Sequence, residues 1–204
     1  MKTPGAILLV ACYELGHQPL NLASPLAMLR RAGFSPVAVD TSVSELSDTA
    51  IAAAHLVAIS APMHTALRLG THVATRVRAI NPNAHICFYG LYATLNADYL
   101  LRTGADSIIG GEYEEALVAL AESLASSNGG APEAVPGVRT RDHDESPVLR
   151  RLAYVAPDRA SLPAPQSYAY LVRGDEMVPA GYVEATRGCL HTCAHCPITP
   201  VYGG

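Results

Sequence analysis

Three of the five cysteines in this sequence lie close together, at Cys189, Cys193 and Cys196, with the spacing Cys-x3-Cys-x2-Cys. Thiolates are the preferred protein ligands of iron–sulfur clusters. Three thiolates on one short loop suit a [4Fe–4S] cluster in which one iron stays free of protein ligands. Gly188 precedes the first cysteine and allows the backbone to turn in closely. The pattern therefore predicts a metal centre with one open iron position.

A structural zinc site is the alternative interpretation of the same loop. Zinc takes four ligands, and His191 or His195 could supply the fourth. However, zinc loops favour paired Cys-x2-Cys units from two places, and this sequence has no second pair. Cys12 and Cys87 fall in or beside expected strands, where a free cysteine is commonly a small buried hydrophobe. The spacing therefore favours the iron–sulfur cluster over zinc.

The overall composition excludes several classes of protein. The formal net charge is −4 and there is no basic run, so no nucleic-acid partner is expected. No apolar stretch approaches the roughly 20 residues of a membrane helix. The apolar run near the N-terminus is short and soon meets Glu14 and His17, which indicates a buried strand instead of a signal peptide. We therefore expect a cytoplasmic protein with no membrane contact, in which clustered cysteines indicate metal or redox chemistry.

Five short apolar runs alternate with helical patterns in the first 126 residues and would position these groups. The predicted strands are 6–11, 36–40, 56–60, 85–90 and 106–111. Their nearly continuous apolar character is typical of strands covered on both faces. The pattern predicts an α/β fold, a doubly wound five-stranded parallel sheet, with strand order 2-1-3-4-5.

Local signals predict where several helices begin and end. Ser24 and Pro25 look like an N-cap followed by proline at the first helical position, and Gly33 would close that helix. Residues 42–45 have the spacing of a capping box. Glu112 and its acidic neighbours are expected in the first turn of a helix, where the helix dipole favours acids.

Ligands of such sheets bind beyond the carboxyl ends of the strands. Ser60, Gly90, Gly110 and Gly111 all fall at this edge. Glycines there would allow a bulky ligand to approach the backbone, and a helix N-terminus would favour its phosphate. Each residue alone has an ordinary explanation as a turn or cap, but together they predict a ligand site.

The composition changes after the fifth unit. We predict an α/β domain over residues 1–127, a linker or connector rich in proline and charge over 128–179, and the start of a second domain over 180–204. Residues 180–186 are expected to form a strand that leads into the cysteine loop.

The segment "RGCLHTCAHCP" resembles the signature loop of radical S-adenosylmethionine (SAM) enzymes, which follows the first strand of a (β/α) barrel. The resemblance implies that Cys189, Cys193 and Cys196 ligate a [4Fe–4S] cluster whose fourth iron binds SAM. An electron donor protein would reduce the cluster, which cleaves SAM to a 5′-deoxyadenosyl radical. The family usually has an aromatic residue near the adenine where this chain has His195, whose imidazole can still stack on SAM.

The segments "GHQPLNLASPLAMLRRAGF" and "GADSIIGGEYEEAL" resemble the flavodoxin-like cobalamin (B12)-binding domain that precedes some radical SAM barrels. The resemblance implies a cobalamin site that includes Ser60, Gly90, Gly110 and Gly111. The Asp-x-His-x-x-Gly motif that ligates cobalt from below is missing, and His17 is the only local imidazole. Cobalamin would then bind without that ligand; a degenerate domain that binds nothing is the alternative.

The resemblance predicts an enzyme whose substrate the sequence does not specify; methyl transfer and other radical modifications both fit. A barrel needs roughly 200 residues, and few follow Cys196. We therefore expect an N-terminal fragment that is inactive alone. The alternative is a non-catalytic flavodoxin-like binding module with a zinc-stabilised tail. No phosphate-loop motif follows the first strand, which argues against nucleotide binding of that type.

Overall fold

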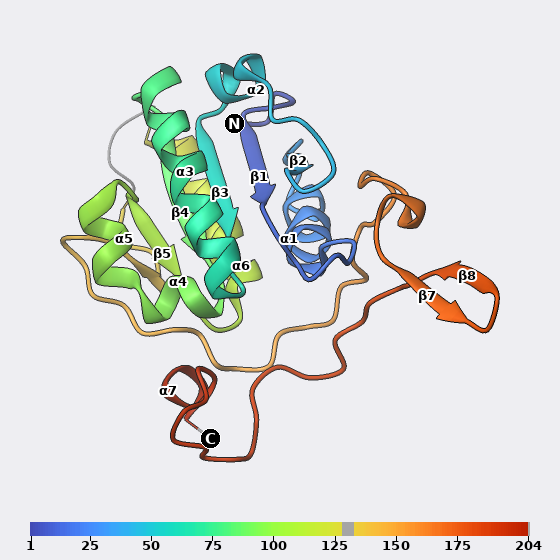
Figure 1. Cartoon of the computed structure of the whole chain (residues 1–204). Helices are drawn as coiled ribbons and strands as arrows, with labels where there is room; N and C mark the ends of the chain where they lie inside the picture. The colour runs from blue at the N-terminus through green and yellow to red at the C-terminus, as the bar shows by residue number, and fades with distance from the viewer. Residues whose placement is uncertain (128–132, 204) are drawn as a thin grey trace.

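A computed structural model describes residues 1–127 and 133–203 and contains a six-stranded sheet in the order β2-β1-β3-β4-β5-β6 (Figure 1). The strands are β1 Ile7–Ala11, β2 Val37–Asp40, β3 Leu56–Ser60, β4 His85–Tyr89, β5 Ser107–Ile109 and β6 Val138–Arg139. The first five are parallel, and β6 pairs antiparallel with β5. The predicted order 2-1-3-4-5 is confirmed, and the fold is flavodoxin-like with one added edge strand.

Helices cover both faces of this sheet. They are α1 Leu20–Arg31, α2 Asp48–Ala53, α3 His64–Ile80, α4 Leu91–Leu95, α5 Ala97–Thr103 and α6 Tyr113–Ser126. One apolar core joins α1 and α6 to one face, and a second core joins the other four helices to the opposite face. Every residue of β1, β3 and β5 is buried, as expected for strands between two helical layers.

Helix α1 begins earlier than predicted. Its N-cap is Pro19, so Ser24 and Pro25 lie inside the helix. Pro25 has no N–H, and the carbonyl of Asn21 four residues before it therefore lacks its usual helical donor. The hydroxyl of Tyr89 donates to that carbonyl at 2.6 Å. Tertiary contact thus compensates a proline that the sequence rules place at a helix start.

One other helix prediction was also wrong in detail. Residues 42–45 form no capping box; Ser47 caps α2 instead, and its hydroxyl accepts from the backbone N–H of Ala50 at 3.2 Å. Ser42 instead forms a turn with Asp40, whose carboxylate accepts hydrogen bonds from the backbone N–H and the hydroxyl of Ser42. The predicted closure of α1 at Gly33 is confirmed, because Gly33 has φ +83° directly after the C-cap.

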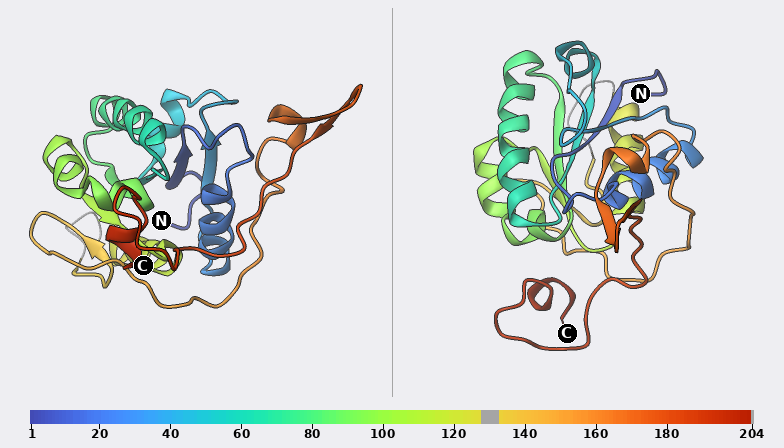
Figure 2. Two further views of the ribbon diagram at one scale, coloured as in Figure 1. Left: turned by 60° about the horizontal axis from the view of Figure 1, so that its bottom comes forward. Right: turned by 45° about the vertical axis from the view of Figure 1, so that its right-hand side comes forward.

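The rest of the described chain wraps the α/β unit as an extended connector (Figure 2). It contains a 3-10 turn η1 Pro165–Ser167, a hairpin of β7 Tyr170–Arg173 and β8 Glu176–Pro179, and a one-turn helix α7 Thr199–Tyr202. The strand predicted over 180–186 is not formed, because no neighbouring strand is present to pair with that segment. Residues 128–132 of the predicted linker lie outside the described residues.

No helix in the described part of the chain is long and apolar enough to cross a membrane.

Candidate functional site

Ser60 and Gly90 lie side by side at the carboxyl ends of β3 and β4, as predicted. Ser60 pairs in register with Tyr89, and Gly90 follows directly. The Ser60 hydroxyl is buried and makes no well-formed hydrogen bond to a described residue, although it interacts with the phenol of Tyr89, whose pKa burial raises and this contact acts to lower. Gly90 has φ +102°, and a Cβ there would lie 3.3 Å from the carbonyl oxygen of Ala61. This part of the edge offers a buried hydroxyl without a well-formed hydrogen bond next to a glycine backbone.

Gly110 and Gly111 also lie at the edge, but the chain itself approaches them. A Cβ on Gly110 would lie 2.2 Å from Oγ1 of Thr94. A Cβ on Gly111 would lie 2.1 Å from the carbonyl oxygen of Val148, which accepts from the N–H of Glu112 at 2.7 Å. Both glycines are therefore needed for packing of the chain in this structure. Their predicted role toward a ligand stays a prediction.

The loop after β1, which was expected to lie at the ligand edge, carries two buried polar groups to which the sequence assigned no role. Glu14 is 8 % exposed, and its Oε2 makes no hydrogen bond to a described residue. Burial raises the pKa of the Glu14 carboxyl from its ordinary value of 4.5 to about 7, against the hydrogen bonds it accepts from Asn21. Nδ1 of His17 is likewise buried without a partner among the described residues. Leu15 between them adopts φ +53°, which is unusual for a non-glycine residue.

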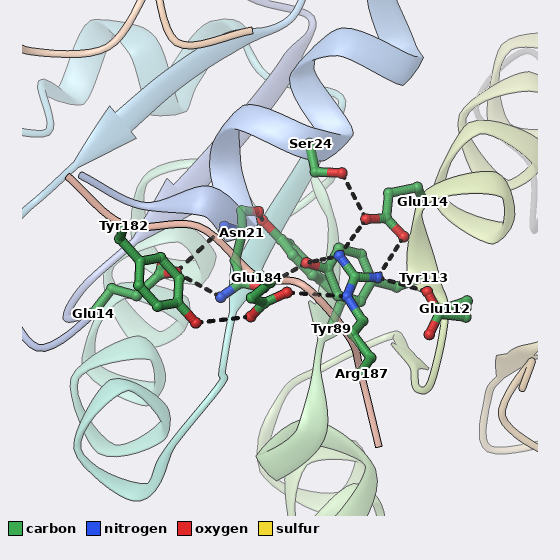
Figure 3. Close-up of polar contacts among 10 residues, drawn as sticks. All are labelled: Glu14, Asn21, Ser24, Tyr89, Glu112, Tyr113, Glu114, Tyr182, Glu184 and Arg187. Atoms are coloured by element: carbon green, nitrogen blue, oxygen red, sulfur yellow. Dashed lines mark hydrogen bonds and ion pairs between the residues drawn. The ribbon is translucent and has the colours of Figure 1, made fainter. Parts of the chain in front are cut away.

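A chain of hydrogen bonds leads from Glu14 across the edge to Arg187 (Figure 3). Arg187 donates to the Tyr113 hydroxyl at 3.3 Å, and that hydroxyl donates to Oδ1 of Asn21. Nδ2 of Asn21 donates to Oε1 of Glu14 at 2.8 Å. Every donor points the same way, from the cation to the buried carboxyl, so neighbouring bonds polarise each other.

Arg187 also forms ion pairs with three carboxylates. It meets Glu114 with two parallel bonds, Nη2 to Oε1 at 2.6 Å and Nη1 to Oε2 at 2.9 Å, and it meets Glu112 at 2.9 Å and Glu184 at 3.3 Å. Its guanidinium lies 4.7 Å from the centre of the Tyr113 ring, within cation–π range. Burial raises the pKa of the Glu114 carboxyl, but Arg187 outweighs burial and holds that pKa below its ordinary value.

The segment before the cysteines crosses this edge. The ring of Tyr182 stacks on His17 with 5.0 Å between ring centres and an angle of 11°. Arg159 binds the Tyr182 carbonyl at 2.7 Å and the Gln18 side chain at 3.0 Å. Residues 182–187 therefore span the carboxyl edge from the loop after β1 to the start of α6.

The cysteine loop follows at the same edge. Gly188 has φ +81°, and the Tyr202 ring packs so closely that a Cβ on Gly188 would lie 3.3 Å from it. This contact brings the two ends of the loop together, and α7 packs against α4. Cys189 and Cys193 are exposed and Cys196 is half-buried, all as free thiols. Within the described residues, no group of three or more His, Cys, Asp or Glu side chains is arranged to hold a metal ion. The side chain of His195 is exposed.

Two cavities lie away from this edge. One of about 480 Å³ is at the amino edge of the sheet, beside His55, His85 and Asp106. The other, of about 320 Å³, lies between α1 and α6 beside Met28 and Val118. Neither includes Ser60, Gly90, Gly110 or Gly111.

Sequence reasoning missed the polar network that connects Arg187 with Glu114, Asn21 and Glu14. Glu112 and Glu114 were interpreted as helix-dipole partners, and Asn21 was not singled out. Arg187 entered only as the first letter of the segment "RGCLHTCAHCP", with no role of its own. A cation next to the loop and acids at the edge of the sheet were the available signals.

Comparison with known proteins gives two positive findings. The family model "B12 binding domain" matches residues 6–121. Among solved structures, the chain is similar to a response regulator receiver domain protein (CheY-like) from Methanospirillum hungatei JF-1, at 18 % sequence identity and a TM-score of 0.43. That similarity covers 60 % of this chain and 94 % of the other. No curated protein matches this chain.

Proposed function

This chain belongs to the B12-binding domain family, and we propose that it binds cobalamin at the carboxyl edge of its sheet, next to Ser60 and Gly90. The family match over residues 6–121 carries this proposal. Ligands of doubly wound sheets bind at that edge. The buried Ser60 hydroxyl makes no well-formed hydrogen bond to a described residue and would be available to a polar group of the cofactor. Because the chain lacks a cobalt-ligating motif after β1, cobalamin would bind without a histidine ligand from it.

The cysteine loop supports a second, finer part of the proposal. Cys189, Cys193 and Cys196 would hold a [4Fe–4S] cluster and His195 would contact SAM. The cluster would supply the electron that cleaves SAM. The donor chemistry fits, since three thiols lie on one loop that starts at a glycine with positive φ, but the loop would have to draw the thiols together to hold the cluster. The loop also lies at the carboxyl edge where we place cobalamin. The whole protein would then be a cobalamin-dependent radical SAM enzyme.

Absorbance titration of the purified chain with hydroxocobalamin tests the first part. We expect a saturable spectral change. Ser60→Ala should weaken the affinity for hydroxocobalamin roughly two- to tenfold, because it removes one hydrogen bond. Ser107→Ala is the matched control, because Ser107 is a buried serine at the amino end of β5, where it contacts His85 at 2.8 Å. The absence of any change at high micromolar cofactor would favour a degenerate domain.

Anaerobic reconstitution with iron and sulfide tests the second part. We expect a broad absorbance band near about 400 nm, as for other [4Fe–4S] proteins. Changing Cys189, Cys193 or Cys196 singly to Ala should abolish the band, whereas Cys12→Ala and Cys87→Ala should preserve it, since both of those thiols are buried. Stoichiometric zinc without iron uptake would instead support a non-catalytic module with a zinc-stabilised tail.

A further inference from the structure

Arg187 stands two residues before the first loop cysteine and reaches back to the start of α6. There Glu112, Tyr113 and Glu114 surround its guanidinium, with two carboxylates at hydrogen-bond distance and the Tyr113 ring beneath it. We call these three residues the guanidinium receptor. The parallel bonds to Glu114 fit the planar fork of arginine, which lysine cannot reproduce.

The contact is better shielded from water than surface ion pairs such as Arg150–Glu115. The side chain of Arg187 is 20 % exposed and that of Glu114 only 6 %. Burial alone would lower the pKa of the guanidinium, but the bonds to Glu114 raise it above its ordinary value, so the group stays charged. A desolvated, well-paired contact costs much more to break than a surface pair.

The receptor is held in place from behind by the α/β unit. The Ser24 hydroxyl donates to Oε1 of Glu114 at 2.7 Å. The Tyr113 hydroxyl is fixed by Asn21, whose carbonyl is in turn bound by Tyr89. These partners belong to α1 and β4, so the receptor is part of the rigid body and not of the loop that it binds.

We propose that Arg187 is a positioning residue that docks the cysteine loop onto the carboxyl edge of the B12-binding domain through this receptor. The docking follows from the contacts above and does not depend on any cofactor. Its consequence, that the receptor sets how the metal group and cobalamin face each other, rests on the proposed function.

Limited proteolysis with trypsin tests the docking, because trypsin must extract the Arg187 side chain to cleave before Gly188. The chain offers a matched internal control in a second Arg-Gly bond, Arg173–Gly174, at the exposed turn of the β7–β8 hairpin. We expect cleavage after Arg187 to be much slower than after Arg173. Glu114→Gln should accelerate cleavage after Arg187 by roughly tenfold or more, because it removes one charge-assisted hydrogen bond. The rate of cleavage after Arg173 should stay the same.

Glu115→Gln is the matched control variant. Glu115 is the next residue of α6 and pairs with Arg150, whose side chain is 68 % exposed, so cleavage after Arg187 should not change. Equal cleavage rates at Arg187 in wild type and Glu114→Gln would overturn the proposal. If Glu114→Gln loosens the whole domain, with faster cleavage everywhere, Glu112→Gln decides, because its carboxylate is less buried; it must accelerate cleavage selectively at Arg187.

The distance between the cobalt of cobalamin and the iron–sulfur cluster tests whether the receptor sets how the two groups face each other. Both centres are paramagnetic, so no spin label is needed. In the reconstituted chain with cob(II)alamin and reduced cluster, electron paramagnetic resonance should give one narrow distance in wild type and a broad distribution in Arg187→Ala. A narrow, unchanged distance in the variant would contradict the positioning role. Failure to load either cofactor would count against the proposed function alone, since the trypsin experiment uses neither.

Discussion

The α/β unit and the C-terminal segment, residues 159–203, are stabilised by different kinds of contact. In the α/β unit, strands such as β3 are buried along their whole length between two apolar cores. In the C-terminal segment every residue of β7 is exposed, and Leu171 and Val172 are 54 % and 66 % exposed. Polar contacts by Arg159 and Arg187 hold this segment, together with a few buried side chains such as Leu162 and Val201.

This difference shows how a short segment with no core of its own can still be placed. Apolar burial sets the fold of the α/β unit, and directional, desolvated polar contacts set where the C-terminal segment lies on it. Those contacts converge on the carboxyl edge, where we propose that cobalamin binds. Breaking either kind of contact should therefore have separable effects.

The largest effect is expected in the apolar core. Phe88 lies in β4 and is 1 % exposed. Phe88→Ala should lower the free energy of unfolding by about 3–5 kcal/mol. Val172→Ala on the exposed hairpin should change it by less than about 0.5 kcal/mol. Urea denaturation followed by circular dichroism measures both, and equal losses would contradict the contrast between the two regions.

The next effect is a pH dependence carried by Glu14. Unfolded, this carboxyl ionises near its ordinary pKa of 4.5, whereas the folded chain keeps the proton until about pH 7. Between these values the folded state binds the extra proton, so its stability falls as pH rises, by about 3 kcal/mol in all. Glu14→Gln should remove this part of the pH dependence. Parallel stability curves for wild type and variant over pH 4.5–7 would show that Glu14 titrates normally.

A smaller effect is expected where Tyr89 binds the carbonyl of Asn21. Tyr89→Phe leaves that buried carbonyl without a donor, because Pro25 cannot supply one, and should cost about 1–3 kcal/mol. Tyr170→Phe is the control, since its hydroxyl binds the exposed Gln166 carbonyl at 3.1 Å. Thermal unfolding of the two variants compares them, and a loss in Tyr170→Phe as large as in Tyr89→Phe would contradict this account.

The smallest effect is expected at the surface ion pair of the connector. Arg150 and Glu115 are 68 % and 36 % exposed. Arg150→Ala should change the unfolding free energy by about 0–1 kcal/mol, and less at high salt. Chemical denaturation at low and high salt checks this; a loss comparable to that of Phe88→Ala would mean that connector pairs matter as much as the core.

The sequence predicted the sheet and its strand order because continuous apolar runs and alternating helices report burial directly. It also placed Ser60 and Gly90 at one edge, since parallel strands end together. It failed for α1, where Ser24 and Pro25 carry a helix-start signal but Tyr89, distant in sequence, supplies the missing donor. Local rules contain no information on such a partner.

The polar network was not predicted for a similar reason. Glu114 is explained locally by the helix dipole, yet in the structure it binds Arg187, 73 residues away in the chain. The strand expected over 180–186 is not formed, because a strand needs a neighbour and no described strand pairs with this segment. The roles of the cysteines and of His195 stay predictions.

Hydrogen exchange of the full chain with and without hydroxocobalamin tests the central claim most directly, because it reports where the cofactor binds. We predict new protection at the carboxyl edge, in residues 60–64 and 90–94, and none at the amino edge, in residues 82–85. Protection confined to the amino edge, where the cavity of about 480 Å³ lies, would contradict the account, as would no protection anywhere at saturating cofactor.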